Sequence, residues 1–236
     1  SDQMGIEMVE SSDLFVEGKY LYMKTVDGPK RIDVVYRRID DEYLDPLSFN
    51  PQSIIGVAGI MDVYRTGGVN ICSAPGSGIA DDKAIYIYVP EMIKFYLGEQ
   101  PILDNVETWN CEKEDHLKYV VDNISNLVIK EVDGSGGYGM LIGPKSSSVE
   151  IEEFKNKLIH NSNGYIAQPL LDLSFSPTLI KNQVEGRRVD LRPFCLMGKE
   201  AQLNPGGLTR VAMNEGSFVV NSSQGGGVKD TWILAE

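Results

Sequence analysis

A glycine-rich loop between two short apolar runs constrains the fold of this chain more than any other feature. Residues 127–129 predict a strand that ends in a single lysine, Lys130, and the loop DGSGGYG follows at once at 133–139. Residues 140–142 predict a second strand. Glycine backbone N–H groups can approach an anion closely, and the lysine adds a positive charge, so the pattern favours a phosphate site. The alternative is a glycine-rich hairpin with a surface lysine.

The order of lysine, loop and strand excludes the better-known glycine-rich loops. A Walker A loop carries its lysine at the end and opens a helix. A dinucleotide-binding loop also needs a helix after it. A protein kinase has its glycine-rich loop before the strand that bears the lysine. Here the lysine comes first and a strand follows the loop, so the motif belongs to another class.

The charge of the chain limits its partners. The chain has 236 residues, enough for one large domain or two small lobes, and its formal net charge is −12. Such an acidic chain argues against general binding to nucleic acid or to an anionic membrane surface. We also find no apolar run long enough to cross a bilayer. Local clusters of arginine, such as Arg37-Arg38 and Arg187-Arg188, are more informative in this background.

The cysteines give no sign of a metal or a disulfide framework. Cys72, Cys111 and Cys195 are far apart, and neither histidine, His116 or His160, lies at a zinc-ligand spacing from them. An odd number of scattered cysteines favours a reducing compartment. We therefore expect a cytoplasmic protein.

Hydrophobic periodicity and turn residues predict an α+β chain with its strands in hairpins. Helices are expected at 53–64, at 83–97 with Pro90 inside, at 114–124, and at 148–160 after a capping box that begins at Ser147. Strands are expected at 14–16 and 20–22 as a hairpin, and at 32–36, 69–73, 127–129, 140–142, 165–171, 188–196, 208–213 and 218–220.

Charged residues at the ends of predicted elements mark further candidate sites. Arg37, Arg38 and Asp40 directly follow an apolar strand, which indicates either a binding loop or a solvated strand end, with equal weight. Lys83 falls in the first turn of a predicted helix, where a cation opposes the helix dipole. Its position is explained by a bound anion, or by simple exposure at small cost.

A third group of charged residues lies on a predicted strand. Arg188, Asp190 and Arg192 alternate with apolar residues and so share one face. Glycine-rich loops at 206–207 and 225–227 surround that strand. The combination favours anion handling, whereas the alternative is a set of ordinary hairpin turns.

Taken as a set, these motifs resemble the ATP-grasp superfamily. The segments that carry the resemblance are DDK at 81–83, VIK before GSGGYG, YIAQPLL at 165–171 and VDLRPF at 189–194. The closer resemblance is to the circularly permuted ATP-grasp proteins of bacteria, related in fold to glutathionylspermidine synthase. It rests on YRRIDDEYLDP, APGSGIADDKAIY, NPGGLTRVA and NSSQGGGVKDTW, and it covers residues 11–236.

The resemblance implies a fold and a division of the chain. Two α+β lobes with antiparallel sheets would enclose a nucleotide cleft. Residues 1–81 would form a substrate-binding segment that precedes the ATP-grasp part. Residues 82–145 would form the lobe with the phosphate lysines and a glycine lid, and 146–236 the lobe with the hinge and the arginine strand.

The resemblance also implies roles for residues. Nucleotide-binding residues would be Lys83, Lys130, Ser135, Gly136, Gly137, Gly139, Gln168 and Leu170. The lysines would contact the phosphates, the glycine loop would fold over them, and the hinge at 168–171 would meet adenine. Arg192 and Arg210 would be catalytic, with Arg192 against the terminal phosphate. Arg37, Arg38 and Asp40 would face an acidic substrate, and Arg210 would also contact it.

The implied activity is ATP-dependent ligation of a carboxylate to an amine. The cofactors would be ATP and Mg²⁺, and the partners small carboxylate and amine substrates or a peptide. The alternative is a non-catalytic nucleotide-binding or interaction module that keeps the fold. A kinase-like phosphotransferase is less favoured, because the chain lacks a catalytic His-Arg-Asp stretch.

One feature of the family pattern is missing. ATP-grasp enzymes hold Mg²⁺ with an acidic residue and a Glu-x-Asn pair, and this sequence has no such pair. Asn204 and Asn221 lie near predicted strands without an acidic partner at the right spacing. Without the metal the chemistry should fail. In circularly permuted relatives the metal segment precedes the part matched here, so we expect this chain to be a piece of a longer protein.

Overall fold

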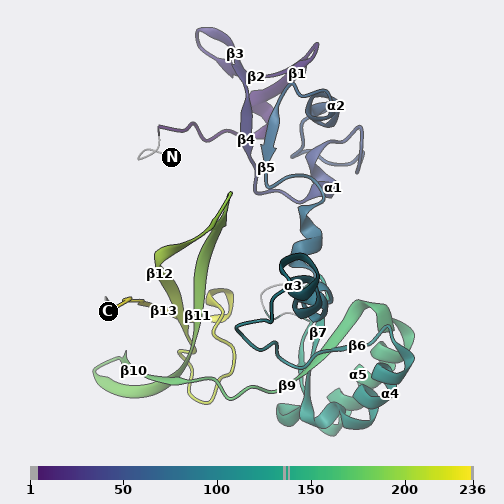
Figure 1. Ribbon diagram of the computed structural model, residues 1–236, viewed down its shortest axis with the longest axis vertical. Coiled ribbons are helices and arrows are strands. Elements are labelled where there is room, and N and C mark those ends of the chain that lie inside the picture. The colour runs from purple at the N-terminus through teal and green to yellow at the C-terminus, as the bar shows by residue number, and fades with distance from the viewer. Residues whose placement is uncertain (1–4, 135–136, 138, 235–236) are drawn as a thin grey trace. The chain divides into compact units, whose positions relative to one another are not determined.

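The computed structural model describes residues 5–134, 137 and 139–234 (Figure 1). The chain divides into two compact units, Ser1–Asp82 and Lys83–Glu236. The division into 1–81, 82–145 and 146–236 stays a prediction. Over the described residues, no helix has the length and apolar character needed to span a membrane. Cys72, Cys111 and Cys195 are free thiols.

The first unit contains two small sheets and short helices. Its strands are β1 (Leu14–Glu17), β2 (Tyr20–Thr25), β3 (Gly28–Ile32), β4 (Val34–Tyr36) and β5 (Asn70–Cys72). Its helices are η1 (Ser11–Asp13), α1 (Asp41–Leu44), α2 (Ile60–Arg65) and η2 (Ser77–Asp81). The strands β1, β2 and β3 pair antiparallel in that order, and β4 pairs parallel with β5. The predicted hairpin at 14–22 is therefore confirmed.

Two predictions in this unit are wrong in their bounds. The strand expected at 32–36 is divided between β3 and β4, and the side chains of Val34 and Tyr36 are exposed rather than buried. The helix expected at 53–64 begins only at Ile60, as α2. Gly59 lies directly before it with φ of 81°, a left-handed conformation that cannot continue a helix backwards. The apolar pattern of residues 53–64 predicted a longer helix, but the left-handed backbone at Gly59 confines the helix to the residues after it.

A buried carboxylate organises the loop that precedes α2. Asp45 is fully buried, and its two carboxylate oxygens accept hydrogen bonds from the backbone N–H groups of Leu47, Gly59 and Met61 at 2.9–3.0 Å. Two of these donors lie at the N-terminus of α2, where a negative charge is favourable. The apolar core of the unit surrounds this point, with Leu21, Leu44, Val57, Ile60, Met61, Val63, Val69 and Ile71 buried.

We expect Asp45→Ala to destabilise the first unit by about 3 kcal/mol, because it removes a fully buried carboxylate and with it the acceptor of three backbone N–H groups, of which that of Met61 makes a buried bond. Urea unfolding followed by circular dichroism measures the loss. The matched control is Asp62→Ala, whose exposed carboxylate makes only a surface ion pair with Arg65. Equal stability of the two variants would contradict the role given to Asp45.

The second unit begins with a sheet and two covering helices. The strands β6 (Trp109–Asn110), β7 (Leu127–Glu131), β8 (Leu141–Ile142) and β9 (Tyr165–Pro169) form the sheet. The helices are η3 (Ile85–Tyr88), α3 (Val89–Leu97), α4 (Glu114–Asn123), η4 (Ile124–Asn126), η5 (Gly143–Lys145), α5 (Ser148–His160) and η6 (Ser162–Gly164). The strand order is β6-β9-β7-β8, and every neighbouring pair is antiparallel.

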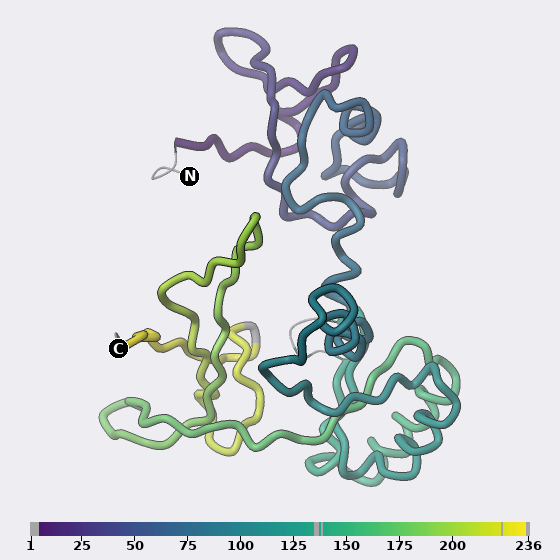
Figure 2. The backbone as a smooth tube through the Cα atoms, in the orientation of Figure 1, coloured from purple at the N-terminus to yellow at the C-terminus, as the bar shows by residue number. Residues whose placement is uncertain are grey.

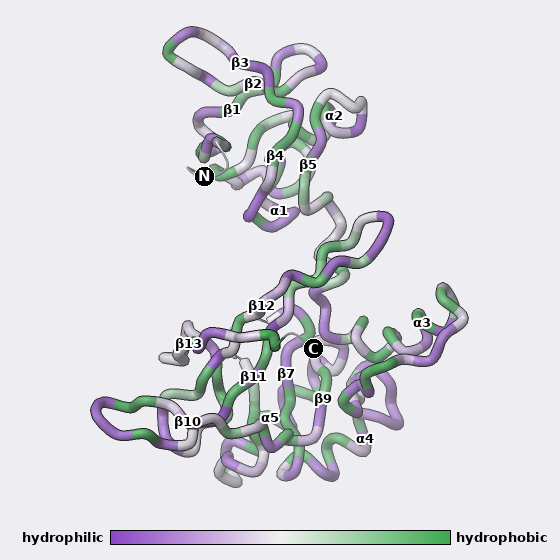
Figure 3. Tube along the Cα trace, turned by 60° about the vertical axis from the view of Figure 1, so that its left-hand side comes forward, coloured by the Kyte–Doolittle hydropathy of each residue, from purple (hydrophilic) through white to green (hydrophobic). Residues whose placement is uncertain are grey.

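The helices α4 and α5 pack on one face of this sheet (Figure 1). Side chains of both helices join Leu127 and Ile129 of β7 and Ala167 of β9 in one apolar core. Figure 3 shows hydrophobic (green) and hydrophilic (purple) residues mixed along the strands and helices of this unit. Because side chains alternate along a strand, Val128 and Lys130 lie on the opposite face. That face is therefore left for the candidate site.

The predictions for α4 and α5 are confirmed. Ser147 caps α5: its Oγ accepts a hydrogen bond from the N–H of Glu150, and a carboxylate oxygen of Glu150 accepts one from the N–H of Ser147. The helix predicted at 83–97 is wrong at its start, because α3 begins at Val89 and Pro90 lies in its first turn. Proline lacks an N–H and fits there without a kink. Lys83 consequently lies outside the helix.

A second antiparallel sheet follows β9 in the chain, as the colour gradient of Figure 2 shows. It consists of β10 (Phe175–Ile180), β11 (Gln183–Met197), β12 (Ala201–Val211) and β13 (Gly227–Asp230), with η7 (Ser222–Gln224) before the last strand. Two predictions fail here. Gly206 and Gly207 lie within β12 rather than in a loop, and residues 218–220 form no strand.

Candidate functional site

Lys130 projects from the face of the sheet that the helices leave uncovered. Its strand, β7, pairs with β9 so that Val128 lies opposite Gln168 and Lys130 lies opposite Ile166. Gln168 therefore shares a face with Lys130, and its side-chain oxygen accepts a hydrogen bond from Lys130 Nζ at 2.7 Å. The amide of Gln168 is oriented in turn by a 2.8 Å bond to Thr108 Oγ1. The ammonium group is thus held in one direction.

The environment of Lys130 disfavours its charge. Burial, and to a smaller extent repulsion from Lys83, lower the pKa of Lys130. A partly buried lysine beside a second cation is a poor arrangement for stability alone. The same arrangement suits an anion, because a negative charge would compensate both the burial of the ammonium group and its repulsion from Lys83.

Lys83 holds the chain between β7 and the glycine-rich loop. Its Nζ donates to the backbone oxygen of Glu131 at 2.9 Å and to those of Val132 and Gly134. Its own N–H donates to the oxygen of Val132 at 3.0 Å. Lys83 thus lies beside the glycine-rich loop. It does not lie in the first turn of a helix, as the sequence predicted, because α3 begins at Val89.

The glycine-rich loop needs glycine at two of its described positions. Gly137 and Gly139 have φ of 78° and 67°, which favour glycine over other residues. A Cβ at Gly139 would lie 2.5 Å from the carboxylate of Glu131, and one at Gly137 would lie 2.8 Å from the side-chain nitrogen of Gln224. The loop is therefore closely packed at both glycines. Ser135 and Gly136, predicted to bind nucleotide, lie outside the described residues.

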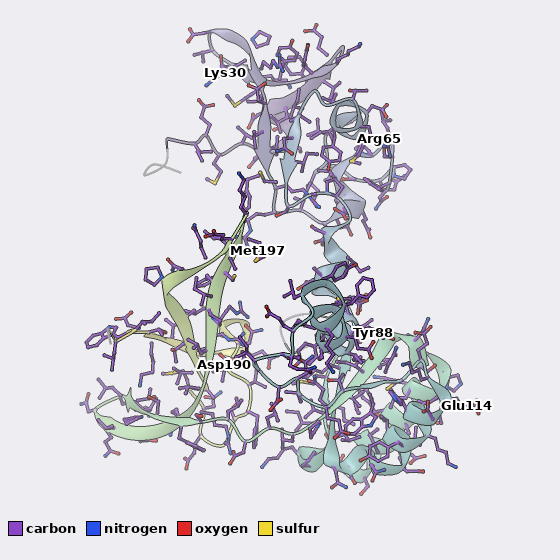
Figure 4. All side chains as sticks on the ribbon, in the orientation of Figure 1. Lys30, Arg65, Tyr88, Glu114, Asp190 and Met197 are labelled. Atoms are coloured by element: carbon purple, nitrogen blue, oxygen red, sulfur yellow. The ribbon has the colours of Figure 1, made fainter. Side chains whose placement is uncertain are left out.

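Arg210 reaches the same region from the second sheet. It pairs with Asp190 across β11 and β12, and its guanidinium donates two hydrogen bonds to the Asp190 carboxylate, one of them 2.9 Å long. Figure 4 labels Asp190 on β11. The hydrogen bond that the guanidinium donates to Asp190 raises the pKa of Arg210. The two-point contact fixes the guanidinium plane, which suits it to receive a planar or tetrahedral anion.

These side chains converge on one pocket of about 320 Å³ within the second unit. Basic residues from three separate segments line it, namely Lys83, Lys130 and Arg210, together with the carboxylate residue Glu131. The remaining described lining consists of Gly134, Gly137, Met140, Phe218, Val219, Val220 and Asn221. Three cations against one acid give the pocket a net positive charge, so its preferred ligand is an anion.

Other predicted site residues lie elsewhere. Gln168 contacts Lys130 and is not among the described lining residues, nor are Leu170, Gly139 and Arg192. Leu170 follows the end of β9, and Arg192 is an exposed residue of β11 on the same strand face as Asp190. Gln168, Leu170, Gly139 and Arg192 all belong to the second unit.

The predicted substrate residues belong to the first unit. Arg37 is nearly buried, and its guanidinium donates to the backbone oxygens of Ser73, Ile39 and Ala74 and to the carboxylate of Asp41. Arg38 and Asp40 are exposed. Arg37 therefore holds two loops of its own unit together, which leaves Arg38 and Asp40 as the more accessible of the three.

Sequence reasoning did not single out several residues of the pocket. Glu131 and Met140 lie at the ends of predicted strands, and Phe218 and Val219 were taken for a strand themselves. The alternation of polar and apolar residues at 188–192 did single out Asp190, which binds the pocket residue Arg210. The guanidinium of Arg188 lies 3.8 Å from the ring centre of Phe218, so one wall of the pocket is supported from β11.

The described residues do not fit a magnesium site. Among them, no three histidine, cysteine, aspartate or glutamate side chains are grouped closely enough to hold a metal ion. The oxygen-bearing side chains of the described pocket lining are those of Glu131 and Asn221. Magnesium demands near-ideal octahedral geometry and in nucleotide sites is usually held by one or two carboxylates plus the substrate phosphates, whereas the described lining offers a single carboxylate. We therefore derive no step through the metal.

Two antiparallel sheets bring lysines, a glycine-rich loop and an arginine to one pocket, an arrangement that agrees with an ATP-grasp-like protein. The chain belongs to the circularly permuted ATP-grasp type 2 family, whose model matches residues 1–212. Members of the ATP-grasp superfamily generally use ATP and Mg²⁺. The resemblance given by the sequence motifs is confirmed at the level of the family.

Three relatives match almost the whole of this chain. The chain is 56% identical over 235 residues to an uncharacterized protein of Synechocystis sp., covering 99% of this chain and 49% of the relative. It is 51% identical over 234 residues to an uncharacterized protein of Mycobacterium tuberculosis, covering 99% and 42%. A Frankia casuarinae protein with the printed name "Putative glutamate--cysteine ligase 2-2" is 40% identical over 241 residues, covering 99% and 27%. The chain thus spans less than half the length of these relatives.

We expect Lys130→Met to raise the free energy of unfolding at pH 7, because it removes a partly buried charge whose pKa is lowered in the folded state. The unfolded wild type binds more protons than the folded one between the lowered and the ordinary lysine pKa, so wild-type stability rises with pH there. The gain from the substitution should accordingly shrink as pH rises through that window.

Urea unfolding at pH 7 and at pH 10 measures this difference. Lys118→Met, which removes an exposed lysine on α4, is the matched control and should leave the pH dependence as in the wild type. A Lys130→Met protein less stable than the wild type at pH 7, with an unchanged pH slope, would contradict the interpretation.

Proposed function

We propose that this chain is the nucleotide-binding part of an ATP-dependent carboxylate–amine ligase. The observation that carries the proposal is the convergence of Lys130, Arg210 and the glycine-rich loop on one pocket. Phosphoryl transfer demands little covalent chemistry from a protein and depends on positioning and charge stabilisation. The pocket offers both, since each cation has a fixed partner that orients it.

In the proposed reaction, a carboxylate oxygen of the acid substrate attacks the γ-phosphorus of ATP. The bond from that phosphorus to the β–γ bridging oxygen breaks, and ADP leaves. The amine nitrogen of the second substrate then attacks the carbonyl carbon of the acyl phosphate. Inorganic phosphate leaves with the bonding electrons, and the nitrogen loses a proton to form the amide. Lys130 and Arg210 would neutralise the charge on the transferring group from two sides.

The remaining site residues take proposed roles around this centre. The backbone at Gln168 and Leu170, where β9 ends, would meet the adenine ring, and Arg192 would approach the terminal phosphate. In the first unit, the exposed Arg38 and Asp40 would contact an acidic or zwitterionic substrate, with Arg37 holding the loop that presents them. These roles follow from the family resemblance and remain proposals.

The substrates are small acids and amines, or a peptide. The printed name of the Frankia relative makes glutamate and cysteine the first pair to test. We propose a cytoplasmic location, as expected for an ATP-consuming ligase with free thiols.

The second candidate is a non-catalytic nucleotide-binding module. It is favoured by one observation, namely that the described residues form no metal site. Such a module would bind ATP through the same pocket without turning it over.

ATP turnover separates the two functions. Phosphate release from ATP is measured with glutamate plus cysteine, and then with pools of amino acids, short peptides and polyamines. The assay is run on this chain and on the longer Synechocystis relative. Substrate-dependent phosphate release supports the ligase. Saturable ATP binding without release in either protein supports the module instead.

We expect Lys130→Met to weaken binding of a non-hydrolysable ATP analogue by at least about tenfold, since a charge-assisted phosphate contact contributes roughly 1.5–3 kcal/mol. Titration calorimetry measures the change, with Lys118→Met as the control for loss of one surface charge. Lys130→Met should therefore stabilise the fold and weaken binding of the ATP analogue. Unchanged affinity would remove Lys130 from the phosphate site.

A further inference from the structure

The parallel pair β4–β5 of the first unit is too small to be a complete sheet. Each strand has three residues, with Val34 opposite Asn70 and Tyr36 opposite Cys72 (Figure 1). Over the described residues, neither strand pairs with a third. Parallel pairing is slightly less stable per residue than antiparallel pairing, and parallel sheets in proteins normally have both faces covered. The pair therefore has the character of a fragment of a larger sheet.

One face of the pair packs on the core of the first unit, whereas the other face is exposed. Ile71 of β5 is buried in that core, and Val35 of β4 packs against the same cluster. Since side chains alternate along a strand, Val34 and Tyr36 lie on the opposite face, and they are 55% and 70% exposed. The exposed face of β4 is thus apolar.

The outer edge of β4 also presents hydrogen-bonding groups of the backbone. The oxygen of Asp33 accepts a hydrogen bond from the N–H of Asn70 in β5 at 2.8 Å. Successive residues of a strand direct their N–H and C=O groups to opposite edges, so Val35 also faces β5, whereas Val34 and Tyr36 face away from it. No strand among the described residues pairs with this outer edge.

The residues of β4 do not protect its edge. Natural edge strands commonly carry charged residues or proline, which prevent pairing with another strand. The edge strand β3 in the other sheet of this unit follows that rule, because its exposed residues are Pro29, Lys30 and Arg31. In contrast, β4 has the sequence Val-Val-Tyr. An apolar edge without such protection is typical of a strand that has a neighbour.

The size of the edge indicates what kind of neighbour fits it. A separate protein or a second copy of this chain would need an interface of roughly 800 Å² per partner, which the backbone groups of Val34 and Tyr36 cannot supply. A segment of the same polypeptide does not lose the full translational and rotational freedom of a free partner, so a few hydrogen bonds suffice. The matched region is 49% of the Synechocystis relative, so a comparable length of chain lies outside it.

We propose that the outer edge of β4 pairs with an extended segment from the part of the longer protein outside the matched region. The segment bonds to the N–H and C=O groups of Val34 and Tyr36, as in strand addition to a sheet edge. Its apolar residues, at alternate positions, pack beside those two side chains. This inference does not depend on the proposed function, because it concerns only the first unit.

Residue-resolved amide hydrogen exchange tests the proposal in this chain and in the longer Synechocystis relative. The amide of Val35, which faces β5, is the internal reference for the amides of Val34 and Tyr36. In this chain the two outward amides should exchange at least about tenfold faster than the reference, because they have no partner strand. In the relative, the amides at all three aligned positions should be protected alike.

A substitution on the exposed face gives a second readout. Tyr36→Lys should leave the urea midpoint of this chain unchanged, because the side chain is exposed. Lysine at the aligned position of the relative should lower the midpoint, because the side chain there packs beside the added strand. The matched control is Val26→Lys, which changes an exposed apolar residue in the turn between β2 and β3 and should have no effect in either protein.

Two results would overturn the proposal. Fast exchange in the relative at the positions aligned with Val34 and Tyr36 would show that no segment of the longer protein pairs with β4. Protection of both amides in this chain alone would show that a second copy or another part of this chain already covers the edge. Sedimentation at two protein concentrations distinguishes these last two cases.

Discussion

The antiparallel pairing of β7 with β9 is the interaction on which the candidate site depends. Its register sends Leu127 and Ile129 into the core beneath α4 and α5, and it sends Lys130 to the opposite face. The same register places Gln168 where it can accept the hydrogen bond of that lysine. A shift by one residue would bury the lysine against the helices and expose the apolar side chains. The hydrophobic core therefore fixes the direction of the charge.

Each cation of the pocket is held by a different kind of partner. A side-chain amide orients Lys130, a carboxylate on the neighbouring strand orients Arg210, and backbone oxygens hold Lys83. The surroundings of the two cations have opposite effects on their charge: the hydrogen bond to Asp190 raises the pKa of Arg210, whereas burial lowers the pKa of Lys130. The surroundings of Arg210 favour its charged form, whereas the surroundings of Lys130 disfavour its charged form. Binding of an anion would favour the charged form of Lys130.

The relatives are much longer than this chain. The chain belongs to a family of ATP-grasp proteins, and it spans less than half the length of the relatives reported above. The described residues supply a pocket lined by three basic side chains and one carboxylate, and they contain no grouped metal site. The clustered basic side chains are thus a property of this chain, whereas their use in ligase chemistry is a proposal.

Local sequence determined the elements whose signals are short-range. The apolar run at 127–129 before Lys130 predicted β7, the Ser147 capping box predicted α5, and glycines at positions such as 137 and 139 matched backbone angles that favour glycine. It failed where a backbone constraint competes with an apolar pattern. Pro90 moved the start of α3, and Gly59 delayed α2. Propensity is a weak signal beside such constraints.

Only the tertiary structure decided which charged residues meet. Lys83 and Glu131 are 48 positions apart, and Asp190 and Arg210 are 20 apart, so their contacts depend on strand pairing and loop path rather than on any local pattern. Arg37 is also a candidate from the sequence, but in the structure its guanidinium donates to Asp41 and to the backbone oxygen of Ser73 in its own unit. The sequence by itself thus determined the types of residue and the family, because motifs are local. The roles of the individual cations were decided by the fold, because each role depends on partners that are distant in the chain.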